Sequence, residues 1–116
     1  MRDIVLQAAG LAAIVVALIH GWLGEAKIFA RARIEPPPLR TLIRLVWQAS
    51  TVAWIGGGVL LIAAPRLASD PARHWIIGTM AVVFAFGAVG NAVATRGRHY
   101  GWMAMSAVVA LAVAGY

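Results

Sequence analysis

The sequence contains no cysteine, and only 12% of its residues are charged. The absence of cysteine excludes disulfide bonds, thiolate metal sites and a cysteine nucleophile together. The low charge argues against an ordinary soluble domain, in which about 25% of the residues are charged because the surface faces water. Much of the surface of this protein must therefore face an apolar medium, and a lipid bilayer is the simplest one.

Negative charge is scarcer still, with 4 acidic residues against 10 Lys and Arg and a formal net charge of +6. A basic balance is also typical of nucleic-acid-binding proteins, but a hydrophobic content of 62% argues against that partner. Positive charge on such a hydrophobic chain is better explained by cytoplasmic loops beside anionic lipid. We therefore expect membrane lipids as partners and no nucleic acid.

Four long apolar segments account for most of the 116 residues, a length typical of one domain. A helix needs roughly 20 apolar residues to cross a hydrocarbon core of about 30 Å. The segments predict membrane spans over residues 4–23, 42–64, 75–94 and 101–116. The last is slightly short, but Trp102 and Tyr116 at its ends are typical of interfacial anchors. The expected fold class is all-α, a single domain (1–116) forming an antiparallel bundle of four transmembrane helices.

A proline triplet at 36–38 separates the first two apolar segments. Consecutive prolines favour an extended, stiff conformation, so the sequence predicts a spacer ahead of the second helix. The residues before the triplet are compatible with a helix. We therefore expect the first helix to continue past the membrane and to stop before the prolines.

Orientation follows from the distribution of Lys and Arg. The first and third connections, with the start of the second span, hold seven of them: Lys27, Arg31, Arg33, Arg40, Arg44, Arg96 and Arg98. The other side holds three: Arg2, Arg66 and Arg73. Because basic residues accumulate on the cytoplasmic side, the count favours a multi-pass protein with both termini outside the cytoplasm, which in a bacterial inner membrane means the periplasm.

Polar side chains are few in the spans, and they gather near the cytoplasmic side. The candidate ligand-binding residues are His20, Glu25, Arg44, Gln48, Asn91 and His99. A helical rise of about 1.5 Å per residue places His20, Gln48 and Asn91 at similar depth, with Glu25 as a possible counter-ion for Arg44. They predict either a polar pocket open to the headgroups or interhelical hydrogen bonds with Arg44 reaching lipid phosphates.

Catalytic and metal signals are weak. No Ser/His/Asp arrangement or phosphate-cradling loop occurs, so we assign no catalytic residue and do not expect an enzyme. A metal site needs paired ligands at suitable spacing, and the three histidines of the chain do not predict one. A haem between His20 and His99, or a bound quinone, is kept as an alternative. The acidic residues lie at ends or in loops, which disfavours a small proton-coupled exporter.

Small residues recur inside three of the segments, where they let membrane helices approach closely. The expected helix-packing residues are Gly56, Gly57, Gly58, Gly87, Gly90, Ser106, Ala110 and Ala114. Trp54 lies near the middle of the second segment, where tryptophan is less expected. It is predicted either to fill the space left by the glycines or to face a partner.

Three short motifs carry a resemblance to a known family. Residues 20–25, His-Gly-Trp-Leu-Gly-Glu, resemble the His-Ser-x-Leu-Gly-Glu stretch of a family of small, uncharacterised four-helix inner-membrane proteins of proteobacteria. Residues 40–54, with Arg-x-x-Trp and Val-Ala-Trp, are similar to that family's second helix, and 97–99 fit as well. Gln48 departs from the pattern, since histidine is common at that place. The resemblance implies the fold and a bacterial inner membrane, and it carries no activity.

Three functions are open on these grounds. The leading hypothesis is a non-enzymatic accessory or assembly subunit that packs against another membrane protein or a second copy of itself. The first alternative is a protein that binds a lipid headgroup, quinone or haem through the polar layer. The second is a small oligomeric transporter or channel.

Overall fold

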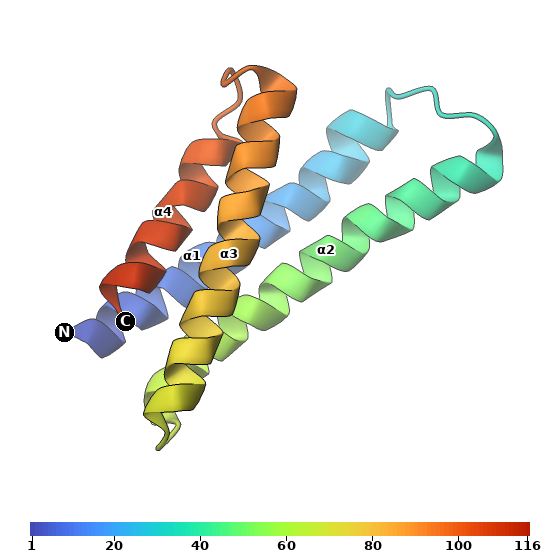
Figure 1. Cartoon of the computed structure of the whole chain (residues 1–116). Helices are drawn as coiled ribbons and strands as arrows, with labels where there is room; N and C mark the ends of the chain where they lie inside the picture. The colour runs from blue at the N-terminus through green and yellow to red at the C-terminus, as the bar shows by residue number, and fades with distance from the viewer.

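The computed structural model describes all 116 residues and is entirely helical, which confirms the all-α class. Its elements in chain order are α1 (Arg2–Leu23), the π-helix η1 (Gly24–Phe29), α2 (Pro37–Ala63), the 3-10 turn η2 (Ala64–Arg66), α3 (Asp70–Thr95) and α4 (Gly101–Ala114) (Figure 1). Three continuous helical segments are long and apolar enough to cross a membrane, with 28, 30 and 26 residues. The helix of 14 residues, α4, is about 21 Å long at 1.5 Å per residue, and is shorter than the expected span.

The first connection differs in part from expectation. The first helix does continue to Phe29 and ends before the prolines, but its last six residues form a π-helix. The extended spacer is wrong for Pro37 and Pro38, because these residues form the first turn of α2 and only Pro36 is extended. A proline fits the first turn of a helix, since its missing N–H would have no intrahelical partner there.

The four helices form two pairs. The helix α1 lies between α2 and α4 and contacts both, α3 packs mainly on α4, and α2 and α3 touch little. Figure 1 shows the pairs α1–α2 and α3–α4 meeting near the two termini and diverging toward the opposite end, where the connections before α2 and α4 lie. This divergence creates the site described below.

Buried side chains concentrate where the pairs meet. The largest fully buried ones are Leu6, Leu61, Ile77, Phe84 and Val108. Small residues bring α1 and α2 together beside this core, and the closest approach is between Gly10 and Gly58. A Cβ atom on Gly10 would lie 2.5 Å from the carbonyl oxygen of Gly58, so the crossing requires glycine. The small-residue face of α1 is not among the predicted helix-packing residues.

The predicted helix-packing residues divide into two groups. Gly57 lies against Met80 and Gly58 against Gly10, while Gly87 lies against Met105 and the ring of Trp54. Gly56 and Gly90 meet no other helix, and Ser106, Ala110 and Ala114 are exposed on α4. Close contact within the chain therefore uses only part of the predicted set. The Trp54 ring lies 5.2 Å from that of Phe84 and fills space inside the protein, the first of the two expected alternatives.

Polar contacts fasten the end that carries the termini. The mostly buried Arg73 donates from Nη1 to Asp3 Oδ1 at 2.6 Å and from Nη2 to the carbonyl oxygen of Gly115 at 2.8 Å. Arg2 donates to the carbonyl oxygen of Tyr116, whose ring stacks on His74 at 4.0 Å. At the opposite end, each hydrogen bond or ion pair joins residues of the same helix pair, either α1–α2 or α3–α4. No polar contact connects the two pairs there.

Candidate functional site

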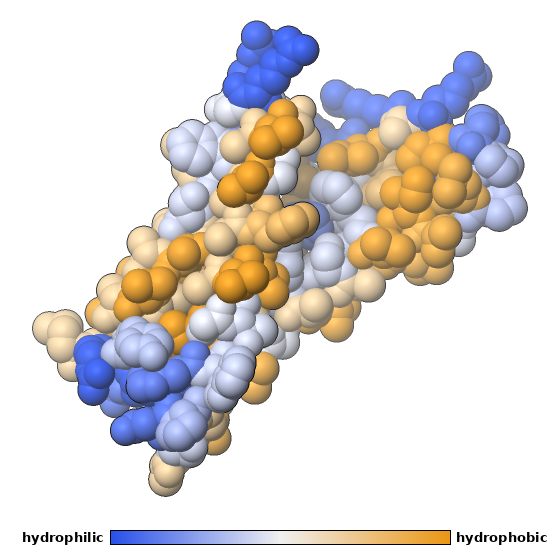
Figure 2. Space-filling view, in the orientation of Figure 1, coloured by the Kyte–Doolittle hydropathy of each residue, from blue (hydrophilic) through white to orange (hydrophobic).

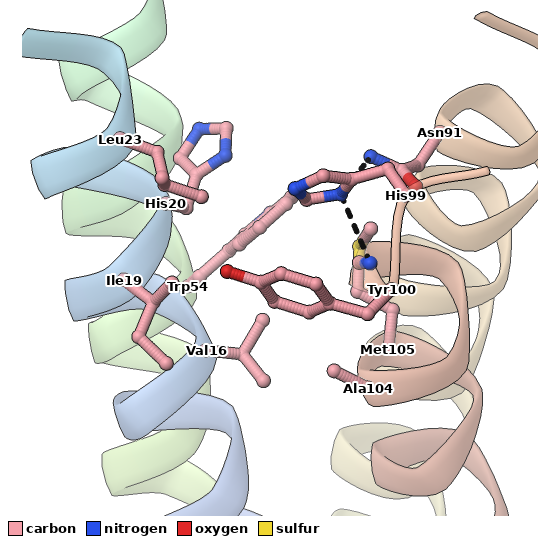
Figure 3. A pocket seen from close by; sticks show the side chains of 11 residues that line it. Val16, Ile19, His20, Leu23, Trp54, Asn91, His99, Tyr100, Ala104 and Met105 are labelled. Atoms are coloured by element: carbon pink, nitrogen blue, oxygen red, sulfur yellow. Dashed lines mark hydrogen bonds between the residues drawn. The ribbon is translucent and has the colours of Figure 1, made fainter. Parts of the chain in front are cut away.

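A cleft of about 330 Å³ opens where the helix pairs diverge. It is lined by His20, Leu23, Lys27, Ile28, Trp47, Asn91, Thr95 and His99. A narrower cavity of about 60 Å³ continues it between α1 and α4, sharing both histidines and adding mostly apolar side chains (Figure 3). We call the two together the interhelical cleft. Its volume lies at the lower end of the range of small-molecule sites, about 300–1,000 Å³.

The wall formed by α1 and α2 is held together beside the start of the π-helix. The carbonyl oxygens of His20 and Gly21, in the last turn of α1, accept from the backbone N–H of Gly24. Each also accepts from a side chain of α2: Trp47 Nε1 donates to the carbonyl oxygen of His20 at 2.9 Å, and Gln48 Nε2 donates to that of Gly21 at 3.1 Å. A Cβ atom on Gly24 would overlap the indole of Trp47, so glycine permits this contact.

His20 lies on this wall in a fixed orientation. Its ring stacks on Trp47 with centroids 4.2 Å apart and lies 4.5 Å from the ring of Trp54. Its Nε2 is 3.0 Å from Ser50 Oγ, and Ser50 donates its one hydroxyl hydrogen to the carbonyl oxygen of Trp47 at 2.6 Å. The hydroxyl must then accept from Nε2–H. These partners assign the neutral ring as the Nε2–H tautomer, which leaves Nδ1 as a free acceptor.

Glu25 and Arg44 lie outside the lining of the cleft. Arg44 binds both carboxylate oxygens of Glu25, at 2.7 and 2.9 Å, and Gln48 donates to the same carboxylate at 2.9 Å. The Arg44 side chain is half exposed. Glu25 is thus the counter-ion of Arg44, and the guanidinium is occupied at the rim of the wall and is not directed into the cleft.

The opposite wall is built around the start of α4. The first backbone N–H groups of a helix lack intrahelical acceptors. Here Gly101 N–H donates to His99 Nδ1 at 3.0 Å, and Trp102 N–H donates to Asn91 Oδ1 at 3.0 Å. Because Nδ1 accepts from a backbone N–H, the neutral ring of His99 carries its proton on Nε2. Figure 3 shows this second ring nitrogen turned toward α1.

The structure thus brings together three of the six predicted site residues, His20, Asn91 and His99, around one cleft. The other three, Glu25, Arg44 and Gln48, form a separate hydrogen-bonded cluster on the outer side of the α1–α2 wall. The predicted site does not include Trp47, Ser50 or Thr95, which also lie in or beside the cleft. The spacing of Trp47, Ser50 and Trp54, three and four residues apart, places them on one helical face and could have indicated a wall opposite His20.

Comparison with known proteins adds no identification. No family model matches the chain, and neither a curated protein nor a solved structure matches it. The family resemblance therefore stays a prediction, and the function must be argued from the geometry of the cleft.

Proposed function

We propose that the protein crosses the bacterial cytoplasmic membrane as an antiparallel four-helix bundle and binds a lipid-soluble small molecule in the interhelical cleft. The observation that carries this proposal is the state of the two histidines. His20 and His99 line the same cleft from opposite walls, and the hydrogen bonds of each ring engage one nitrogen and leave the other without a partner in the chain. A polar group at membrane depth needs a hydrogen-bond partner, and a bound molecule would supply it.

The surface supports the membrane placement. Large apolar side chains are exposed on all three long helices, and on α3 they include Phe86, Trp75 and Val93 at 81, 77 and 73%. In Figure 2 the hydrophilic residues gather at the two ends, and apolar residues cover the sides between them. A soluble monomer rarely exposes a contiguous apolar patch of more than a few hundred Å². The seven-to-three distribution of basic residues favours a cytoplasmic location for the end that holds the cleft.

The short α4 supports the position of the cleft. With a length of about 21 Å it does not reach across a core of about 30 Å, whereas α3 beside it has 26 residues. If α4 is anchored at the periplasmic side by Tyr116, its capped N-terminus lies below the cytoplasmic surface. The cleft would then open at the level where lipid headgroups meet acyl chains, which suits an amphipathic ligand.

The test is recovery of a bound molecule from the protein purified out of native membranes in mild detergent. Native mass spectrometry should detect a bound molecule on the wild type. Ile28→Trp fills the cleft and should abolish the adduct, whereas Val46→Trp adds the same bulk to the exposed outer face of α2 and should retain it. Wild-type protein without any bound molecule, or an adduct that survives Ile28→Trp, would overturn the proposal.

One observation favours a second function, that of an accessory or assembly subunit. Ser106, Ala110 and Ala114 form an exposed small-residue stripe on α4, beside a shallow groove of about 440 Å³ between α3 and α4. Such a stripe lets the backbone of another membrane helix approach closely. Ala110→Phe should then release a copurifying membrane protein that Val52→Phe, a control on the exposed side of α2, retains. No feature of the structure favours an oligomeric transporter or channel over these two functions.

A further inference from the structure

We infer that the molecule bound in the interhelical cleft is an isoprenoid quinol, a neutral planar amphiphile whose hydroxyl groups both donate and accept hydrogen bonds. The inference rests on the proposed function and names its ligand class. It comes from the combination of one hydrogen-bond acceptor, one donor, aromatic walls and an apolar continuation in the same cleft.

The two free ring nitrogens are complementary and not equivalent. The contacts of Ser50 leave His20 Nδ1 as an acceptor, and the contact of Gly101 leaves His99 Nε2–H as a donor. A quinol hydroxyl can donate to His20, and an oxygen of the same molecule can accept from His99. The oxidised quinone has only acceptor oxygens, so its carbonyl would face the lone pair of His20 without a hydrogen. The pair therefore favours the reduced form.

The lining of the cleft favours a neutral aromatic headgroup. Aromatic rings form much of its surface, including the stacked pair of His20 and Trp47 in the wider part. Figure 3 shows Trp54 and Tyr100 in the narrower part. A planar ring can stack on such a surface. Lys27 is the single Lys or Arg of the lining, and Arg44 is bound to Glu25. A phosphate headgroup is normally bound by Arg or Lys clusters, and this cleft lacks one.

The same hydrogen bonds disfavour a haem held between the two histidines. Iron bound at His99 Nε2 would require the ring proton to move to Nδ1. That proton would face Gly101 N–H at 3.0 Å and the amide nitrogen of Asn91 at 3.4 Å, both of them donors. A metal-binding histidine normally directs its second N–H at a carboxylate, carbonyl or water. His99 is arranged in the opposite way, as a donor toward the cleft.

The narrower part of the cleft offers room for the start of an isoprenoid tail. Val16 and Ile19 of α1 face Ala104 and Met105 of α4 there, and the lining is mostly apolar. Ile19 is 40% exposed and Leu18 beside it 57%, so this wall leads to the apolar outer surface of α1. A tail leaving the cleft on this side would pass into the acyl chains of the membrane.

The experiment compares equilibrium binding of decylubiquinol and decylubiquinone to the purified protein in detergent, under anaerobic conditions, by native mass spectrometry. We expect the quinol to bind more tightly than the quinone by about five- to tenfold, the effect of one hydrogen bond. Dioleoylphosphatidylglycerol and haem serve as competing ligands of the other two classes.

Two variants remove one ring nitrogen each. His20→Phe keeps an aromatic ring beside Trp47 and removes the acceptor, so it should weaken quinol binding and erase the preference over quinone. His99→Asn keeps an acceptor for Gly101 N–H and removes the Nε2–H donor, so it should weaken both ligands by about five- to tenfold. His74→Phe, at the opposite end of the protein, is the matched control and should change neither affinity. Unchanged helix content and unfolding midpoint would confirm that each variant is folded.

The outcomes separate the two proposals. One outcome is that the phospholipid or haem binds, that Ile28→Trp abolishes this binding, and that neither decylubiquinol nor decylubiquinone binds. In that case the quinol inference is wrong and the proposed function stands. If quinone and quinol bind equally and neither histidine variant matters, the inference is wrong as well. If none of the four ligands binds and no native molecule copurifies, both are wrong.

Discussion

Replacing Gly10 with alanine tests the contact that holds α1 against α2. The new Cβ atom would lie 2.5 Å from the carbonyl oxygen of Gly58 and 2.7 Å from Ile62 Cγ1, closer than the 3.0 Å below which such contacts essentially do not occur. The first of these atoms belongs to the backbone, so it cannot move aside by a change of rotamer. The two helices must instead separate along the crossing.

The size of the effect follows from a matched pair of variants. Gly56→Ala makes the same chemical change on α2, where no atom lies within 4 Å of the new Cβ. Both variants gain the helix propensity of alanine over glycine, about 0.5–1 kcal/mol. Overpacking a tight contact costs about 1–3 kcal/mol, so the difference between the two variants should equal that steric cost alone. At about 1.4 kcal/mol per tenfold change, this is a shift of about 5- to 150-fold in the unfolding equilibrium.

The assay is reversible unfolding of the purified protein in mixed micelles by increasing the fraction of sodium dodecyl sulfate, followed by tryptophan fluorescence. Gly10→Ala should lower the free energy of unfolding relative to the wild type, and Gly56→Ala should leave it unchanged or raise it slightly. Equal stability of the two variants would show that α1 and α2 do not cross at Gly10 and Gly58. The relative placement of α1 and α2, and with it one wall of the cleft, would then be wrong.

Three further results are expected. A single cysteine at Ser69 should react with a membrane-impermeant thiol reagent on intact cells and one at Arg33 should not, and the reverse pattern would invert the proposed topology. Gln48→Leu removes the hydrogen bonds to Gly21 and Glu25 and should lower the free energy of unfolding by about 1.2 kcal/mol, at an average of about 0.6 kcal/mol for each polar contact between membrane helices. A loss several times larger in the same micelle assay would assign Gln48 a wider role. Asn91→Leu removes the acceptor of Trp102 N–H at the start of α4 and should lower the free energy of unfolding by about 0.5–2 kcal/mol in that assay. An unchanged free energy of unfolding would mean that α4 is not capped in this way.

The sequence predicts the helices of this protein better than their contacts. Apolar runs of about 20 residues identify the three long helices, because chain length and hydrophobicity alone decide whether a helix can span a bilayer. The π-helix after Leu23 was not predictable in this way, and neither were the hydrogen bonds of Trp47 and Gln48 to the carbonyl groups before it, since hydropathy reports no contact between helices. The prolines were misassigned because a proline in the first turn of a helix and one in an extended spacer have the same φ.

The candidate site illustrates the same limit. Depth along a helix can be counted from the sequence, and it correctly placed His20, Gln48 and Asn91 near one end. The direction in which each side chain points is set by tertiary contacts, and these turn Gln48 away from the cleft and toward Glu25. The tautomers of the histidines depend on single hydrogen-bond partners, Ser50 for one ring and Gly101 for the other. No pattern in the sequence reports those partners.

The interhelical cleft and its ligand are tested together by an experimental structure of the protein purified from native membranes and kept in lipid throughout. We expect α1–α2 and α3–α4 to diverge at the basic end, with density for a non-protein molecule between them, within hydrogen-bond distance of His20 Nδ1 and His99 Nε2. A structure in which the two helix pairs close onto each other, with His20 and His99 hydrogen-bonded to protein groups and the cleft filled by side chains, would contradict it.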